Sequence, residues 1–380
     1  MLQQLMEDIP VNELSSKQLK SLQDAIVDFI KLQLPSDEEE YVCKMMVELF
    51  YILSKNQFFL KLRQSFWKNN YGVPSLDFLL FSKKIFIELV EKINEEPAFK
   101  DITKSILSNL EKYKRHIKDN DNNLYDLYEK PNPDSSGSFI ATVNKQGFMT
   151  TAANDCFSVQ FIERAEQSSS LVDGRVLEIG AAYGVASLAA LKRGATVVCN
   201  DLEPEHLAVV VKEHLKIEKG TLTPVAGSFP DELVFNDNQF DAILISRVLH
   251  FFDGKQLINS LKKARKWLKI GGSLFVVNET PYLLNWGSFL DEYIARKHSG
   301  EKWPGLINNT KKYEKNRSGS LPPLVHWLDE DTLLQALNEA GFANDEIQIS
   351  YINREGQFPP DMLMKDMQKE SVGCRATRLG

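Results

Sequence analysis

The first third of the chain has the apolar spacing of consecutive helices. From Leu19 to Ile30, apolar residues recur every three to four positions, which is the period of one helix face. Pro35 interrupts this pattern, and the capping sequence at 36–39 (Ser-Asp-Glu-Glu) then opens a second helical stretch. Further stretches with the same spacing follow, so the pattern predicts an all-α N-terminal domain over residues 1–118.

A polar segment with loop-forming residues follows these helices. Residues 118–123 are charged or carry amides, and residues 130–137 contain two prolines and a glycine. Such clusters are typical of loops between folded elements. We therefore place a linker at 119–138 and expect a second domain at 139–380.

From residue 171 onward, short runs rich in β-branched residues alternate with helical stretches. The expected strands are 176–179, 196–199, 221–225, 240–245 and 273–277. The expected helices are 184–193, 204–218, 254–269 and 329–340. Alternating strands and helices imply βαβ crossovers, and hence an α/β domain with a mostly parallel sheet covered by helices on both faces.

Composition narrows the class of protein. Hydrophobic residues make up 43% and charged residues 26%, and the net charge is −7. A negative chain lacks the basic surface of a general nucleic-acid binder. The start of the chain has no apolar signal-peptide core, and no run approaches the roughly 18 apolar residues of a membrane span. We expect a cytoplasmic protein with neither nucleic-acid nor membrane partners.

The four cysteines are far apart in sequence. Their spacing matches neither a CxxC pair nor a metal-ligand motif. We expect reduced thiols and no metal site.

A turn containing glycine follows the first expected strand, in the stretch Leu177-Glu178-Ile179-Gly180-Ala181-Ala182-Tyr183-Gly184. Nucleotide-like ligands bind at the carboxyl ends of such strands, where glycine lets the backbone come close. The dinucleotide motif GxGxxG would need glycine at position 182 and glycine or alanine at position 185, where the sequence has Ala182 and Val185. An acidic residue followed by GxGxG fits better and departs only at Ala182.

This turn resembles motif I of class I S-adenosylmethionine-dependent methyltransferases. Three later segments resemble that family in the same order: Asn200-Asp201-Leu202, Gly227-Ser228-Phe229 and the run from Ser246 to His250. Residues 269–274 are similar to its approach to the fifth strand. The resemblance covers roughly residues 140–378. It implies an enzyme with a Rossmann-like fold, a mostly parallel seven-stranded sheet, and S-adenosylmethionine as cofactor.

The resemblance also implies which residues contact the cofactor. The residue matching Asp201 accepts hydrogen bonds from the ribose hydroxyls, and Leu202 packs on the adenine. Ser228 stands where the family often has an acidic residue, and Met149 lies in a segment similar to the cap over the cofactor. The expected cofactor-binding residues are Met149, Glu178, Gly180, Ala181, Gly184, Asp201, Leu202, Ser228, Phe229, Ser246 and Arg247.

Two residues after the central strands are candidate catalytic groups. The sulfonium of the cofactor already activates its methyl group, so the protein must mainly position the reactants and exclude water. A base helps when the nucleophile is a hydroxyl or a protonated amine. We expect His250 to be this base, or else to pack against Phe251. Glu279 is a base or an amine-binding group, or a solvated turn carboxylate. Candidate substrate residues are Tyr282, Trp286 and His326.

A long insertion at 281–325 separates the fifth strand from the last helix. Connections of this length are often lids. Its basic residues are Arg296, Lys297, Lys302, Lys311, Lys312, Lys315 and Arg317. They would attract an anionic substrate or an acidic protein surface, or else form a solvated loop.

Three hypotheses about function follow. The first is methyl transfer to an oxygen or nitrogen of a small molecule. The second is a protein side-chain methyltransferase whose helical N-terminal domain recognises the target, and the third is a non-catalytic binding module that retains the fold. The sequence Ser-Arg-Val-Leu at 246–249, in place of Asn-Pro-Pro-Tyr, argues against the amino-methyltransferases of adenine and glutamine. The oligomeric state stays open.

Overall fold

The computed structural model describes residues 75–80, 82, 125, 128–144, 147–151, 155–314, 321–364 and 366–380. Residues 76–80 and 82 are helical, as the apolar spacing there predicts. Otherwise the predicted helical domain at 1–118 lies outside the described residues. Residues 128–380 form a unit of their own, which the following paragraphs describe.

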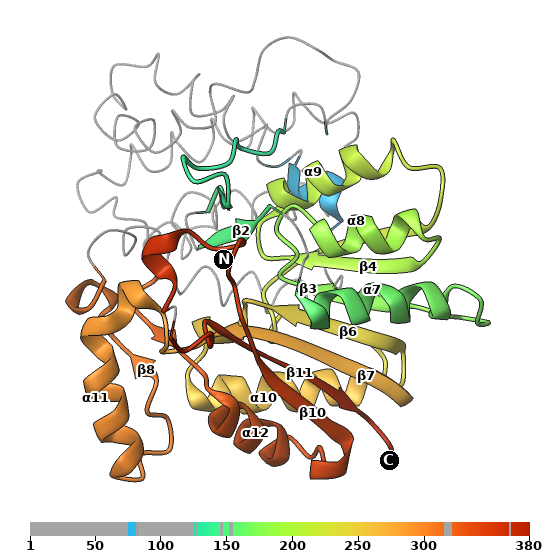
Figure 1. Ribbon diagram of the computed structural model, residues 1–380. Coiled ribbons are helices and arrows are strands. Elements are labelled where there is room, and N and C mark those ends of the chain that lie inside the picture. Colours follow the sequence, from blue (N-terminus) through green and yellow to red (C-terminus); the bar gives the residue numbers. More distant parts are fainter. Residues whose placement is uncertain are drawn as a thin grey trace, which may run out of the picture. The chain divides into compact units, whose positions relative to one another are not determined.

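A seven-stranded sheet forms the centre of this unit (Figure 1). Its strands are β3 (Val176–Ile179), β4 (Thr196–Asp201), β5 (Thr221–Ala226), β6 (Phe240–Ser246), β7 (Leu268–Glu279), β10 (Ile347–Ile352) and β11 (Ser371–Thr377). Their order is β10-β11-β7-β6-β3-β4-β5. Strand β11 is antiparallel to both neighbours, and the pairs from β7 to β5 are parallel. The predicted mostly parallel, seven-stranded Rossmann-like fold is confirmed.

The central strands are apolar because both of their faces are covered. Leu177 of β3 pairs with Ile243 of β6 on one side and with Val198 of β4 on the other, and all three side chains are buried. Runs of this kind are typical of parallel sheets with helices on both sides. Strand β7 begins earlier than predicted, because Leu268 already pairs with Phe240 before the register shifts.

Helices cover the two faces of the sheet (Figure 1). On one face lie α7 (Cys156–Ser168), α8 (Val185–Lys192) and α9 (Pro204–His214), and on the other α10 (Gly254–Trp267) and α12 (Glu330–Glu339). The Asp329 carboxylate accepts a hydrogen bond from the Thr332 N–H at 2.9 Å, as expected of an N-cap. The helix ends were predicted less well. Helix α10 stops at Trp267 because Leu268 is already extended, and α9 stops at His214.

The largest apolar core lies between the sheet and the α10/α12 layer. Ile243 and Ile245 of β6 meet Leu257 of α10 and Leu337 of α12, and all four are fully buried. Burial of each such side chain stabilises the fold by roughly 1.5–3 kcal/mol. This packing holds the carboxyl ends of β3, β4 and β6 at one edge of the sheet.

The described part of the insertion is folded and packed. It contains η4 (Leu284–Trp286), α11 (Gly287–His298), β8 (Leu306–Ile307), η5 (Thr310–Lys312) and β9 (Val325–His326), which pairs with β8. Trp286, Phe289 and Tyr293 are buried in a cluster that also includes Phe139 and Phe358. The insertion therefore shares its core with segments that come before β3 and after β10.

Several basic residues of the insertion are paired with carboxylates. Lys302 Nζ lies 2.9 Å from Glu339, and Lys312 Nζ lies 3.1 Å from Glu292. Arg296 also pairs with Glu292, and Lys297 pairs with Asp329 and Asp331. These pairs neutralise four of the seven basic charges locally. They therefore weaken the argument that the insertion attracts an anion through its net charge.

Two further features bear on the class of protein. Cys156, Cys199 and Cys374 are free thiols, and Cys43 lies outside the described residues. Within the described ranges, no helix combines the length and apolarity needed to cross a membrane.

Gly373 of β11 tests the packing between the sheet and α7. A Cβ at this position would lie 2.2 Å from Phe157 Cδ2 and 3.0 Å from Ile352 Cδ1. Gly373→Ala should therefore lower the free energy of unfolding by about 1–3 kcal/mol, measured by urea denaturation, because the Phe157 ring must move. The control is Gly287→Ala at the start of α11, where nothing lies within 4 Å. Equal urea midpoints for the two variants would contradict this packing.

Candidate active site

A cavity of about 260 Å³ opens where β3, β4 and β6 end. Ligands of parallel α/β sheets bind at this edge. A hairpin of β1 (Phe139–Ala141) and β2 (Phe148–Thr150) contributes a further wall. All predicted cofactor-binding residues except Gly184 line the cavity: Met149, Glu178, Gly180, Ala181, Asp201, Leu202, Ser228, Phe229, Ser246 and Arg247. Both candidate catalytic residues, His250 and Glu279, line it too.

The turn after β3 depends on left-handed backbone conformations. Gly180 has φ +67° and Gly184 has φ +71°, values that glycine adopts without strain. A Cβ at Gly180 would lie 2.3 Å from Val248 Cγ2, and one at Gly184 would lie 2.7 Å from Val210 Cγ2. Gly184 is thus required for packing at the start of α8, which explains why it lies outside the cavity wall.

Ala182, the one departure from the GxGxG pattern, also lies in the left-handed region, at φ +46°. This conformation is uncommon for a residue with a Cβ and needs support from its surroundings. The Asp201 carboxylate gives that support by accepting a hydrogen bond from the Ala182 N–H at 2.7 Å. The turn therefore keeps its shape without a third glycine.

Glu178 is buried below this turn. Its Oε2 accepts a hydrogen bond from the Ser187 N–H at 2.7 Å and another from the Ser187 hydroxyl. Burial raises the pKa of Glu178 to about 7, although both hydrogen bonds favour the ionised form. Glu178 thereby fixes α8 to β3 at one wall of the cavity.

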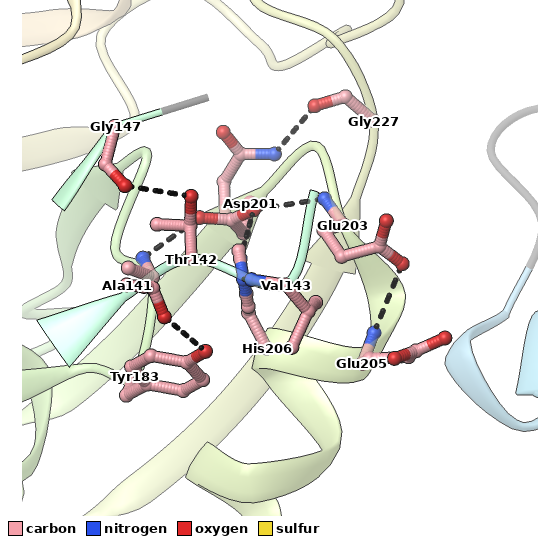
Figure 2. A network of polar contacts seen from close by, with 12 residues as sticks. Ala141, Thr142, Val143, Gly147, Tyr183, Asp201, Glu203, Glu205, His206 and Gly227 are labelled. Carbon is pink, nitrogen blue, oxygen red and sulfur yellow. Dashed lines mark hydrogen bonds and ion pairs between the residues drawn. The ribbon is translucent and has the colours of Figure 1, made fainter. Parts of the chain in front are cut away.

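The Asp201 carboxylate accepts three hydrogen bonds within the protein (Figure 2). Besides the bond from Ala182, its Oδ1 accepts from the Glu203 N–H at 2.8 Å and from His206 Nδ1 at 2.9 Å. A carboxylate offers about four lone-pair positions. About one position is left for a ligand, whereas the prediction from sequence assigned both ribose hydroxyls to Asp201.

His206 connects Asp201 to the β1–β2 hairpin. The ring is buried, and its Nε2 accepts a hydrogen bond from the Val143 N–H at 3.2 Å, so the neutral ring carries its proton on Nδ1. Tyr183 adds a second link by donating to the Ala141 carbonyl at 3.0 Å (Figure 2). The sequence analysis missed His206, because no motif signals a histidine whose partner precedes it by 63 residues.

A buried charged group lies at the ends of β6 and β7. Glu279 pairs through Oε1 with Arg247 Nε, and its Oε2 lies 3.1 Å from His250 Nδ1. Burial alone would raise the pKa of Glu279, but the Arg247 guanidinium and His250 hold it well below its usual range. Glu279 is therefore ionised throughout the physiological pH range and is a poor proton acceptor.

The packing against Phe251 considered for His250 is present, and the role of His250 as base stays a prediction. The ring packs edge-on against Phe251, with ring centres 4.1 Å apart, and it also lines the cavity. Arg354 is a cavity residue that the sequence analysis missed. It is buried, donates from Nε to Ser371 Oγ at 2.9 Å, and lies 3.7 Å from the Asp155 carboxylate.

The three candidate substrate residues lie in different places. Trp286 lines the cavity, whereas Tyr282 and His326 do not. Tyr282 packs on Tyr293, with ring centres 5.9 Å apart. His326 donates from Nδ1 to the Phe252 carbonyl at 3.1 Å, and burial lowers its pKa to about 4. The substrate roles of these residues stay predictions.

The raised pKa of Glu178 predicts a pH-dependent loss of stability. In the unfolded chain this carboxyl ionises near 4.5, but in the folded protein it ionises near 7. Between these values the folded state binds more protons, so stability falls as the pH rises through this window. At roughly 1.4 kcal/mol per pH unit, the loss reaches about 3 kcal/mol.

Glu178→Gln removes this ionisation, which provides the test. The free energy of unfolding of Glu178→Gln, relative to the parent protein, should rise by about 3 kcal/mol between pH 4.5 and 7.5. Urea denaturation across this range measures the difference. Glu218→Gln, at an exposed carboxylate, is the control and should show no such trend. A flat difference for Glu178→Gln would refute the raised pKa.

The central segment of the chain matches a known protein family. The family described as "Methyltransferase domain" matches residues 176–272. No curated protein matches the chain significantly.

Three solved structures illustrate the structural similarity. A methyltransferase from Methanosarcina mazei is 18% identical with a TM-score of 0.40, covering 54% of this chain and 92% of its own. One from Mesorhizobium loti is 18% identical with a TM-score of 0.39, covering 54% and 90%. The phosphoethanolamine N-methyltransferase 2 of Haemonchus contortus, solved with S-adenosyl-L-methionine, is 14% identical with a TM-score of 0.38, covering 58% and 53%. With TM-scores below 0.5, none of them bears on the function of this chain.

The family match covers the strands and turns that build most of the cavity. It includes β3, β4, β5, β6 and the start of β7, with the glycine turn, Asp201 and His250. Residues 176–272 of the chain therefore match a methyltransferase domain.

Proposed function

We propose that this protein transfers the methyl group of S-adenosylmethionine to an oxygen or nitrogen of a small molecule. One observation carries the proposal: the segment that matches the methyltransferase family brings its glycine turn, Asp201 and His250 to a single cavity. Glu279, just beyond the matched segment, joins the same cavity beside His250. The cavity thus combines a candidate cofactor cradle with a candidate base.

The residues at β3, β4 and β5 fit the cofactor. The turn at Gly180 gives backbone access, and Asp201 keeps about one lone-pair position for a ribose hydroxyl. Leu202 is 43% exposed although it is large and apolar, and it lines the cavity. An adenine ring lying on Leu202 and Phe229 would remove this surface from water. When bound, S-adenosylmethionine supplies a methyl group that its positively charged sulfur has already activated.

His250 acts as the general base in this proposal. Glu279 is held ionised by Arg247, and it orients the His250 ring from the Nδ1 side. That leaves Nε2 to take the proton from the substrate hydroxyl or amine, whose oxygen or nitrogen would bond to the methyl carbon as the bond from that carbon to the cofactor sulfur breaks. Glu279 then stabilises the imidazolium that results.

A small-molecule substrate suits the enclosure of this base better than a protein side chain does. His250 is only 5% exposed, and Trp286 of the insertion and Trp327, which follows β9, also line the cavity. The protein-directed alternative depends on the N-terminal helices, most of which lie outside the described residues. A non-catalytic module would not need the His250–Glu279 pair. A cytoplasmic location stays a prediction.

Label transfer tests the proposal directly. The full-length protein is incubated with methyl-labelled S-adenosylmethionine and a cell extract, and the extract is then separated into small molecules and protein. We expect label in the small-molecule fraction, with His250→Gln protein as the background control. Label in the protein fraction would support the second hypothesis, and label in neither fraction would contradict a methyltransferase.

Leu202→Ala tests the cofactor cradle. Because Leu202 is exposed, the variant should fold normally. Its affinity for S-adenosylhomocysteine, measured by calorimetry, should fall about fivefold, equivalent to roughly 1 kcal/mol of lost apolar contact. Leu215→Ala is the control, since Leu215 is 65% exposed and lies outside the cavity lining. An unchanged affinity in Leu202→Ala would argue against adenine on this side chain.

His250→Gln tests the base. Turnover with the labelled small-molecule fraction should fall by about 10²–10⁴-fold, while affinity for S-adenosylhomocysteine stays within about twofold. His298→Gln replaces an exposed histidine at the end of α11 and should leave turnover unchanged. Normal turnover in His250→Gln would show that another group, or water, takes the proton.

A further inference from the structure

Unpaired polar atoms gather on one side of the cavity. Three buried side-chain atoms of cavity-lining residues have no partner among the described residues: Arg247 Nη1, Asn285 Oδ1 and Trp327 Nε1. A buried polar group without a partner costs about 1–3 kcal/mol, so such groups usually face a ligand or water. These residues follow β6, belong to the insertion or follow β9, whereas the cofactor cradle comes from β3, β4 and β5.

Several contacts fix the side chain of Arg247, but one of its terminal nitrogens has no hydrogen-bond partner. Its backbone has φ +61°, which is strained for a residue with a side chain, and its N–H donates to the Val277 carbonyl at 2.7 Å. Its guanidinium carbon lies 5.5 Å from the ring centres of both Phe139 and Phe358, while Nε pairs with Glu279. The guanidinium of this cavity-lining residue is therefore fixed, and its buried Nη1 has no hydrogen-bond partner.

Trp327 supplies a second unpaired donor. The residue is 3% exposed, and its ring packs at 4.9 Å from Trp286 and 5.5 Å from His250. An indole N–H only donates, as does a guanidinium, so these two groups cannot satisfy each other. Both need an acceptor atom from outside the chain.

Charge determines which acceptor fits best. On this side of the cavity, Glu279 balances Arg247 and the Asp155 carboxylate lies 3.7 Å from Arg354, so these charges cancel in pairs, whereas the Asp201 and Glu178 carboxylates line the cofactor side. The sulfonium of the cofactor adds a positive charge to this balanced set. A neutral carbonyl would satisfy the donors, but an anionic oxygen also offsets the added charge and forms the stronger, charge-assisted hydrogen bond.

We propose that this side of the cavity binds a carboxylate of the small-molecule substrate, with Arg247 Nη1 and Trp327 Nε1 as its hydrogen-bond donors. The lining rings of Phe148, Phe251 and Trp286 accommodate a planar apolar body. The inference rests on the proposed function, because it assumes that the cofactor lies beside this site.

Calorimetry on the full-length protein tests the inference in two steps. The first step titrates S-adenosylhomocysteine. The second titrates benzoate and trans-cinnamate into the loaded protein, and compares them with benzamide and cinnamamide, which have the same shape without the charge. We expect the acids to bind at least about tenfold more tightly than the amides.

Two variants test the donors. Trp327→Phe removes the N–H and keeps the ring, so it should reduce the preference for the acids at least about threefold, with affinity for S-adenosylhomocysteine unchanged. Arg247→Met should abolish the preference, but it also leaves the buried Glu279 carboxylate without its partner, so Trp327→Phe is the decisive variant. Arg193→Met is the control, since Arg193 pairs with Glu166 at the surface.

The outcomes separate the two proposals. No binding of S-adenosylhomocysteine would refute the proposed function itself. Binding of S-adenosylhomocysteine followed by equal affinities for acids and amides, or by no acid binding, would overturn the carboxylate site alone. Tighter binding of phenyl phosphate than of benzoate would overturn the choice of carboxylate. A preference that survives in Trp327→Phe would overturn the assignment of the donor.

Discussion

The carboxylate of Asp201 holds together the segments that meet at the cavity. It accepts hydrogen bonds from the turn after β3, from the start of α9 and from His206, which in turn accepts from the β1–β2 hairpin. The left-handed conformation of Ala182 persists because this carboxylate holds its N–H. The cradle for a nucleotide-like ligand thus depends on one buried group, placed by the end of β4.

A sequence predicts such a structure well where the determining contacts are local. The bounds of β3 match the prediction because three of its four residues are apolar, as in a strand covered on both faces, and Asp329 marks the start of α12 by its capping chemistry. Helix ends are less readable: α10 stops where Leu268 joins the sheet, and this depends on a pairing with the distant Phe240.

The same difference between local and distant contacts distinguishes the two sides of the cavity. The side from β3 to β5 is encoded in contiguous motifs, so its residues were identifiable one by one. The other side is assembled from the insertion and from Arg354, with Phe139 and Phe358 against Arg247. Phe139 and Phe358 are each more than a hundred positions from Arg247 in the sequence, and no spacing rule connects them. His206 was missed for the same reason, since its role exists only once the hairpin has folded beside α9.

The two sides of the cavity also differ in whether their buried hydrogen-bond donors already have acceptors. Around Asp201 the buried N–H groups of Ala182 and Glu203 already have acceptors, so this side is formed before any ligand arrives. Around Arg247 and Trp327 the donors are unpaired, and each carries a desolvation cost until an acceptor enters. A ligand that binds on the first side, around Asp201, enters a preformed shape. A ligand that binds on the second side, around Arg247 and Trp327, supplies acceptors and so removes the desolvation cost of the unpaired donors. Under the proposed function, discrimination between methyl acceptors would therefore depend on the second side, because a molecule lacking the matching acceptor leaves those donors unpaired.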